Sequence, residues 1–172
     1  ALTMRRFFYT VLLLLISVAV NAEQGLYDDR IVVGQVSDLS GATAVWGVST
    51  TNGTRMRFDE VNAAGGIHGR KLELIVEDGQ YQVPVSVKAA NKLLNRDRVF
   101  VMLGNIGTPA NNAIMPRQFR MGVANLFPVT AAVSMYEPLH PMKFSYYVSY
   151  RDQIRGAVHY MAKKSGASKV CM

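Results

Sequence analysis

Short apolar runs rich in β-branched residues alternate along this chain with longer stretches in which apolar residues recur at helical spacing, and this alternation leaves few folds open. The first run is Ile31–Ser37, and similar runs follow at intervals. Turn-forming residues such as Gly, Pro, Ser and Asp bound them. Strands that alternate with helices of about 10–15 residues form a parallel sheet covered by helices. We therefore predict an α/β fold, a doubly wound parallel sheet with helices on both faces.

The individual elements follow from the same pattern. The expected strands are Ile31–Ser37, Lys71–Gly79, Val99–Leu103, Gly122–Phe127, Lys143–Ser149 and one that begins in the closing "SKVCM". The expected helices cover about 48–63, a stretch after Pro84, about 109–120 with a kink at Pro116, and 152–164. Their spacing predicts three buried faces, which are Thr54/Phe58/Val61, Val87/Ala90/Leu94 and Ile154/Val158/Met161.

The N-terminal residues have the three parts of a secretory signal peptide. Two arginines follow Met4, the apolar stretch Phe7–Val20 comes next, and small residues precede a cleavage point after Ala22. The apolar stretch is shorter than the roughly 20 residues that span a bilayer, which favours a cleaved signal over an uncleaved anchor. We expect residues 1–22 to be upstream residues plus a signal peptide, and the protein to be periplasmic or otherwise extracytoplasmic.

Charge and cysteine content narrow the possible partners. The formal net charge is +7, but the basic residues are scattered and form no polybasic run. Nucleic acid is therefore not an expected partner. The single cysteine, Cys171, has no second cysteine in this chain to pair with, and a buried apolar role is expected for it.

The stretch "GNIGTPANN" (Gly104–Asn112) follows an expected strand and opens an expected helix. Its glycine spacing matches neither the Walker loop nor the dinucleotide fingerprint, and it contains no G-x-S-x-G elbow. None of the histidines pairs by spacing with a metal ligand or a candidate serine; they are His68, His140 and His159. We predict no catalytic, metal or cofactor site, and hence no enzyme, although an enzyme of flavodoxin-like architecture stays open as an alternative.

Ligands of such sheets bind outside the carboxyl ends of the strands. The residues expected there are mostly uncharged and hydrogen-bonding, with two aromatic side chains: Ser40, Gly41, Thr43, Asn105, Thr108, Asn111, Thr130, Ser134, Trp46 and Tyr81. A helix that starts after Gly107 presents free N–H groups and a positive dipole end, which suit a carboxylate. This set favours a cleft for a small solute, while ordinary capping and turn chemistry explains any single member equally well.

Four stretches resemble a known family. "IVVGQVSDLSG", "FDEVNAAGGIHGRKLELIVEDG", "AANKLL" and "VMLGNIGTPANNAIMP" are similar to the N-terminal lobe of type I periplasmic binding proteins, in the leucine/isoleucine/valine-binding subgroup of ABC-transporter receptors. The resemblance runs from about Ile31 to Val170, and "VNAAGGIHGRKLEL" carries it most strongly. It implies an exported receptor of two α/β lobes that close on an amino acid, amide or small carboxylate and deliver it to an ABC permease, with no cofactor.

The resemblance also implies domains and site residues. Residues 23–149 would be an incomplete N-terminal lobe, and residues 150–172 the crossover and the start of a truncated second lobe. Leucine-binding members carry threonine where this chain has Ala131, whereas the hydroxyl here lies one residue earlier, so leucine specificity does not follow. The implied ligand-binding residues are Trp46, Gly107, Thr108, Val129, Thr130 and Ala131.

Two alternatives to an importer receptor stay open at this point. The same fold serves as the ligand-sensing ectodomain of membrane receptors, and the chain could be a non-functional gene fragment.

Overall fold

A computed structural model of the chain describes residues 23–166 and 169. The described elements are, in order, β1 (Arg30–Ser37), α2 (Ala44–Ala63), β2 (Lys71–Asp78), α3 (Val83–Asn95), β3 (Val101–Leu103), α4 (Thr108–Arg120), β4 (Ala124–Leu126), the 3-10 helix η1 (Val133–Met135), β5 (Lys143–Phe144) and α5 (Tyr150–Ser165). The predicted signal peptide and, Lys169 apart, the last predicted strand lie outside the described residues.

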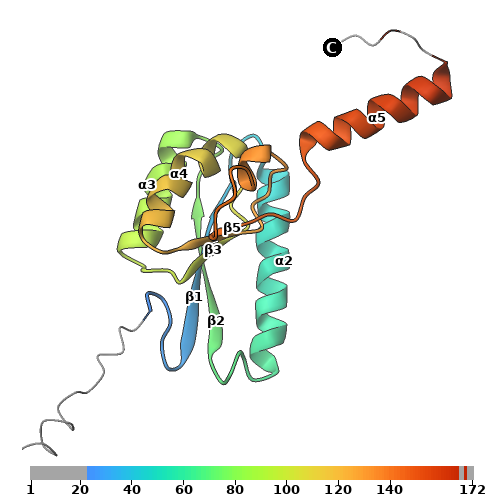
Figure 1. Cartoon of the computed structure of the whole chain (residues 1–172). Coiled ribbons are helices and arrows are strands. Elements are labelled where there is room, and N and C mark those ends of the chain that lie inside the picture. The colour runs from blue at the N-terminus through green and yellow to red at the C-terminus, as the bar shows by residue number, and fades with distance from the viewer. Residues whose placement is uncertain (1–22, 167–168, 170–172) are drawn as a thin grey trace, which may run out of the picture.

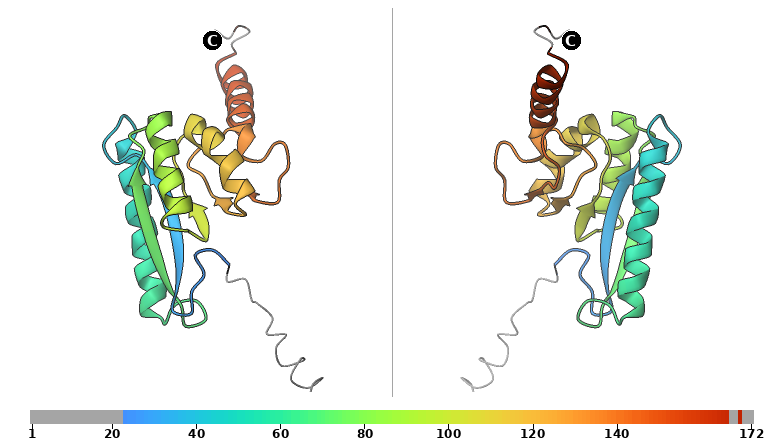
Figure 2. Two further views of the ribbon diagram at one scale, coloured as in Figure 1. Left: turned by 90° about the vertical axis from the view of Figure 1, so that its left-hand side faces the viewer. Right: turned by 90° about the vertical axis from the view of Figure 1, so that its right-hand side faces the viewer.

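The strands form one sheet in the order β2-β1-β3-β4-β5, and every neighbouring pair is parallel. Helix α2 lies against β1 and β2 on one face, whereas α3 and α4 lie on the other (Figure 1). The side views show the same layers, with β1 and β2 between α2 and α3 (Figure 2). The predicted α/β fold, a parallel sheet with helices on both faces, is confirmed.

The main core lies between the sheet and the pair α3 and α4. Leu93 and Leu94 of α3, Met102 of β3 and Ile114 of α4 are all almost fully buried there. The face predicted for α3 is confirmed, because Ala90 and Leu94 are buried and Val87 is half-buried against the same cluster. The face predicted for α2, Thr54/Phe58/Val61, is half-buried.

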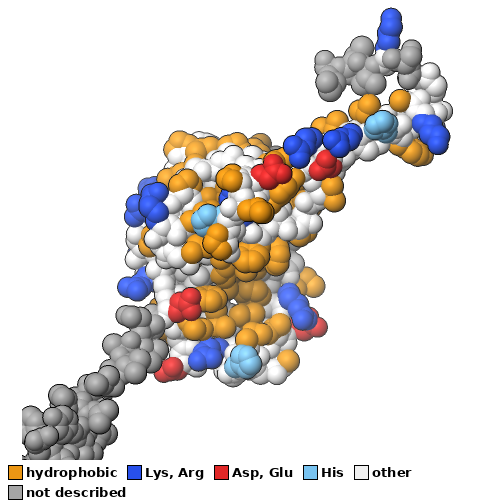
Figure 3. All heavy atoms as spheres, viewed as in Figure 1, with side chains coloured by type: hydrophobic (Ala, Val, Ile, Leu, Met, Phe, Trp, Pro, Cys, Tyr) orange, Lys and Arg blue, Asp and Glu red, His pale blue; other side chains and the backbone are white. Residues whose placement is uncertain are grey.

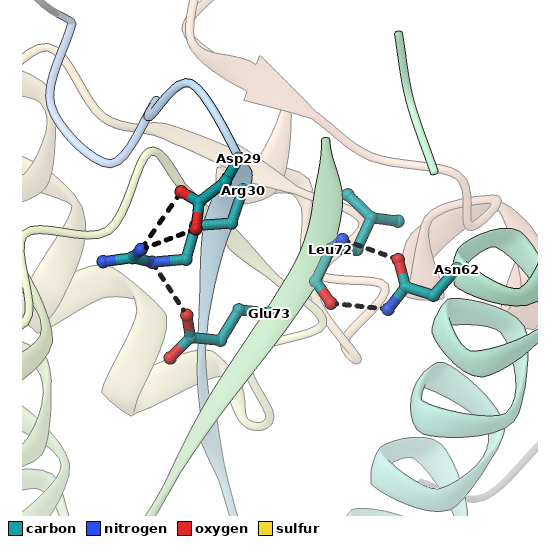
Figure 4. A network of polar contacts seen from close by, with 5 residues as sticks. All are labelled: Asp29, Arg30, Asn62, Leu72 and Glu73. Atoms are coloured by element: carbon teal, nitrogen blue, oxygen red, sulfur yellow. Dashed lines mark hydrogen bonds and ion pairs between the residues drawn. The ribbon is translucent and has the colours of Figure 1, made fainter. Parts of the chain in front are cut away.

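The amino end of the sheet is fastened by polar contacts (Figure 4). The Asn62 side chain of α2 accepts a hydrogen bond from Leu72 N at 2.7 Å and donates one to Leu72 O at 2.9 Å. β2 is an edge strand, so this amide occupies backbone groups that would otherwise be unpaired. Beside it, Arg30 of β1 pairs with Glu73 of β2 at 3.2 Å. Asn62, which belongs to the family-like stretch "VNAAGGIHGRKLEL", therefore has a structural role: it fastens the end of α2 to the start of β2.

The fifth strand is shorter than predicted. It ends at Phe144, whereas the sequence pattern extends it to Ser149. Its partner β4 ends at Leu126, and the next residue, Phe127, has a φ of 49°, which ends the extended backbone there. With no partner strand to continue along, the chain leaves the sheet, and Ser149 instead caps α5 by accepting a hydrogen bond from Asp152 N at 3.1 Å.

Helix α5 forms where the sequence predicts it, but its predicted buried face is wrong. None of its residues is buried, and Ile154 and Met161 are 57% and 56% exposed. The helix projects away from the sheet and its covering helices (Figure 1), with hydrophobic and basic side chains both on its surface (Figure 3). No described element packs along this helix, so its regularly spaced apolar residues stay exposed.

In the part of the chain that the structure describes, no helix combines the length and apolar character that a membrane crossing requires.

Candidate functional site

The strand order creates a crevice at the carboxyl end of the sheet. Adjacent strands β1 and β3 are followed by helices on opposite faces, α2 after β1 and α4 after β3. The two connections therefore diverge from a common point, which is where ligands of doubly wound sheets bind. Here those connections are residues 38–43 and 104–107, with the segment after β4 beside the second, since Ile106 and Val129 form a parallel bridge.

A pocket of about 120 Å³ opens between these connections. Trp46, Gly107 and Val129 line it, so the structure brings together three of the residues that the family resemblance implies. The remaining lining residues are Thr43, Tyr81 and Ile106. No charged side chain is among them, and Trp46 is 65% exposed. The pocket thus offers aromatic and aliphatic contact rather than a counter-charge.

Two more of the implied residues meet through their hydroxyls. Thr108 Oγ1 and Thr130 Oγ1 lie 2.5 Å apart and share a hydrogen bond. Thr130 is almost fully buried, and its Oγ1 also accepts a hydrogen bond from Ala132 N at 3.3 Å. The sixth residue, Ala131, is buried and does not line the pocket; its carbonyl accepts a hydrogen bond from Tyr150 N at 2.9 Å.

The start of α4 supplies hydrogen-bond donors next to this pair. Gly107 is the N-cap, with a φ of 91°, and no side chain caps the helix. Its carbonyl accepts from Asn111 N at 3.1 Å, which leaves the Thr108 and Ala110 N–H groups of the first turn without a capping side chain. Uncapped N–H groups at a helix start attract an anionic oxygen such as a carboxylate.

Three buried asparagines fix the loop that carries Gly107. Asn105 accepts a hydrogen bond from Val36 N at 2.8 Å and donates to Asn125 at 3.2 Å. Asn125 donates to Asn111 at 3.1 Å, and Asn111 donates to the carbonyls of Asn105 (3.0 Å) and Gly107 (2.8 Å). The sequence places Asn105 and Asn111 among the residues facing a solute; the structure corrects this, because both side chains are buried and bonded within this network.

Two aspartates hold the first connection. Asp38 accepts hydrogen bonds from Gly41 N (2.6 Å) and from both the N–H and the hydroxyl of Thr43 (2.7 Å each). Burial raises the pKa of Asp38, but these bonds outweigh it and leave the pKa below its ordinary value. Asp78 accepts from Leu39 N at 2.9 Å and from the Ser40 hydroxyl at 2.5 Å, and its pKa is lowered in the same way against the effect of burial. Both carboxylates are structural anchors.

Sequence reasoning missed part of the pocket. Thr43 and Tyr81 stand among the strand-end residues but not among the implied site residues, and Ile106 was not singled out. A signal for Ile106 was present, since it lies between Asn105 and Gly107 in the same loop.

Within the described residues, no group of three or more His, Cys, Asp or Glu side chains is placed to hold a metal ion.

Comparison with known sequences identifies relatives of this chain. A family model described as periplasmic binding protein matches residues 30–172. The leucine-specific-binding protein of Salmonella typhimurium is 36% identical over 89 residues, which cover 52% of this chain and 24% of that protein. An amino acid binding protein of Pseudomonas aeruginosa is 29% identical over 94 residues, covering 53% of this chain and 25% of its own length. The match thus spans about a quarter of these curated relatives.

Solved structures give the same result for the fold. A substrate-binding periplasmic protein from Ralstonia solanacearum superposes with a TM-score of 0.74 at 27% identity, over 78% of this chain and 38% of that one. A fatty acid ABC transporter substrate-binding protein from Thermomonospora curvata superposes with a TM-score of 0.78 at 24% identity, over 85% of this chain and 36% of that one, and shows the fold alone. The family model, the relatives and the parallel sheet agree, and the chain belongs to the periplasmic binding protein family.

Proposed function

We propose that this chain is the N-terminal lobe of an extracytoplasmic solute-binding receptor of an ABC importer, and that an amino acid or similar small polar solute binds between it and a second lobe. One observation carries the proposal. Trp46, Gly107 and Val129 line a single pocket at the point where the connections after β1 and β3 diverge, beside the paired hydroxyls of Thr108 and Thr130.

The geometry suggests how a zwitterionic solute would lie. Its carboxylate would meet the first turn of α4, where Thr108 offers both an N–H group and a hydroxyl. Its side chain would enter the uncharged pocket beside Trp46. No carboxylate lines this pocket, so the solute's ammonium group would be neutralised by the second lobe.

The proposed domain boundary is at residue 150. Residues 23–149 form the sheet with its covering helices, whereas α5 starts at Tyr150 and has no buried residue. A helix with exposed apolar residues and no packing partner is expected where a second domain begins. Residues 150–172 would then be the crossover and the start of the second lobe, and the signal-like residues 1–22 would direct export.

The names of the relatives support an amino-acid solute. The matched proteins of Salmonella typhimurium and Pseudomonas aeruginosa are named for binding leucine and amino acids. The fold alone does not choose the solute, because a neighbour named for fatty acids has the same fold. The partners that follow from this proposal are a small solute and a membrane permease.

The test uses the extended receptor, meaning the two-lobed protein that this proposal describes, with this chain as its N-terminal lobe. Its melting temperature is measured with a panel of amino acids, amides and small carboxylates. A true solute stabilises the folded state by mass action, by about 2.7 kcal/mol at 100 times its Kd. No shift with any member of the panel would contradict the proposal.

Trp46 gives that experiment a local reporter. It is the single tryptophan of this sequence, and it stands at the mouth of the pocket. Solute binding should change a fluorescence component that is present in the wild type and absent from Trp46→Phe. A solute that stabilises the receptor without changing that component would bind elsewhere.

A further inference from the structure

The turn after β2 brings an aromatic ring into the solute pocket in an unusual backbone conformation. Gln80 and Tyr81 are consecutive non-glycine residues with φ values of 53° each, in the left-handed region that most side chains avoid. The turn is held by hydrogen bonds on either side: Gly79 N donates to Ser37 O at 2.7 Å, and Gln82 N donates to Gly79 O at 2.9 Å. This conformation carries the Tyr81 ring to the pocket wall.

Neighbouring loops make room for this turn with glycines. A Cβ atom on Gly41 would lie 2.5 Å from the carbonyl oxygen of Gln80, and one on Gly107 would lie 2.8 Å from Cε2 of Tyr81. Real Cβ atoms do not approach other atoms so closely, so a larger residue at either position would displace the turn or the ring. The connections after β1 and β3 are therefore both shaped to receive Gln80 and Tyr81.

The Tyr81 ring occupies space that a solute group would otherwise fill. It lies against Gly107, the N-cap of α4, next to which the solute's polar end is proposed to bind. The pocket that remains is about 120 Å³. A shorter side chain at position 81 would widen this pocket on the side of Gly107.

We propose that Tyr81 is a specificity-determining residue of the receptor: its ring, held against Gly107, sets the upper size of the apolar group that the pocket accepts. The inference rests on the proposed solute-binding function. It predicts that shortening this side chain changes the order in which solutes bind, and not only how tightly they bind.

The experiment measures dissociation constants of the extended receptor for alanine, valine, leucine, phenylalanine and tryptophan by calorimetric titration. In Tyr81→Ala the ratio of affinities for phenylalanine and valine should rise at least tenfold over the wild type. Tyr81→Phe keeps the ring and should keep the wild-type order. Tyr27→Ala is the matched control, because this half-exposed tyrosine precedes β1 at the opposite end of the sheet and should leave the order unchanged.

A second variant separates specificity from folding. Glycine adopts positive φ freely, so Tyr81→Gly removes the ring while relieving the backbone strain at this position. Its melting temperature should be no lower than that of Tyr81→Ala, and its preference should shift in the same direction.

The outcomes distinguish the two proposals. A wild type that binds none of the five amino acids would overturn the inference, and failure across the wider panel of amides and carboxylates would overturn the proposed function as well. Binding by the wild type with the same order in Tyr81→Ala and Tyr81→Gly would overturn only the role of Tyr81.

Discussion

Helices α3 and α5 are both predicted from the sequence, but α3 packs against the sheet and α5 does not. Both helices have apolar residues at helical spacing. In α3 the predicted face is buried at Ala90 and Leu94 and half-buried at Val87, whereas no residue of α5 is buried. The spacing of apolar residues therefore determines which side of a helix can be buried, whereas a packing partner determines whether that side is buried.

The largest effect should come from the core of the packed region. Leu93→Ala removes a side chain with no exposed surface and should lower the free energy of unfolding by about 2–5 kcal/mol, through lost burial and the cavity left behind. Urea denaturation measures this. A loss below 1 kcal/mol would mean that the core under α3 is not close-packed.

The buried amide network should give the next largest effect. Asn111→Ala leaves the carbonyls of Asn105 and Gly107 without their side-chain donor and should cost about 1–3 kcal/mol. Asn112→Ala is the matched control, since this exposed neighbour on α4 should change stability by less than about 0.5 kcal/mol. If urea denaturation shows an equal loss of stability in both variants, the network does not stabilise the loop.

Lowering the pH should reduce the stability that Asp38 gives to residues 38–43, the connection between β1 and α2. The folded-state pKa of Asp38 is depressed below its unfolded value, so its contribution is fully present above the ordinary carboxyl pKa and is lost as the pH falls through the folded one. Asp38→Asn should therefore be less stable than the wild type at pH 7, with a gap that narrows below about pH 5. The free energy of unfolding of both proteins is measured at several pH values. A difference between them that stays constant as the pH falls would contradict this.

The smallest effect is expected in α5. Ile154→Ala in the present chain should change the free energy of unfolding by less than about 0.5 kcal/mol, because the side chain is already exposed. In the extended receptor, the same change should cost about 2 kcal/mol or more if the second lobe covers this helix. No added cost there would contradict the proposed domain boundary at residue 150.

Much of the fold could be predicted from the sequence. The β-branched run at Ile31–Ser37 and the apolar spacing after Pro84 each predict one conformation, because their signals are local. The length of β5 could not be predicted, since it depends on where β4 ends, and that is fixed by the backbone of Phe127. The prediction of a buried face on α5 was wrong for a similar reason, because burial depends on a packing partner and the described residues supply none.

The candidate site was predictable only in outline. The carboxyl ends of the strands and the glycine before α4 indicate the edge of the sheet at which the pocket lies. Polar residue types alone did not separate Thr108 from Asn111, because both are hydrogen-bonding and stand at the same edge. Only the structure shows that Asn111 spends its donors on the loop carbonyls. The contribution of Tyr81 needed the shape of a turn from another strand.

We infer that the start of α4 holds the polar end of a solute, and calorimetric titration of the extended receptor measures this. Thr108→Val removes the hydroxyl and should weaken the affinity at least tenfold, because a hydrogen bond to a charged group contributes about 1.5–3 kcal/mol. Thr54→Val, whose hydroxyl bonds only within α2, should bind as the wild type does. Unchanged affinity in Thr108→Val would contradict the account and reduce this loop to a turn between β3 and α4.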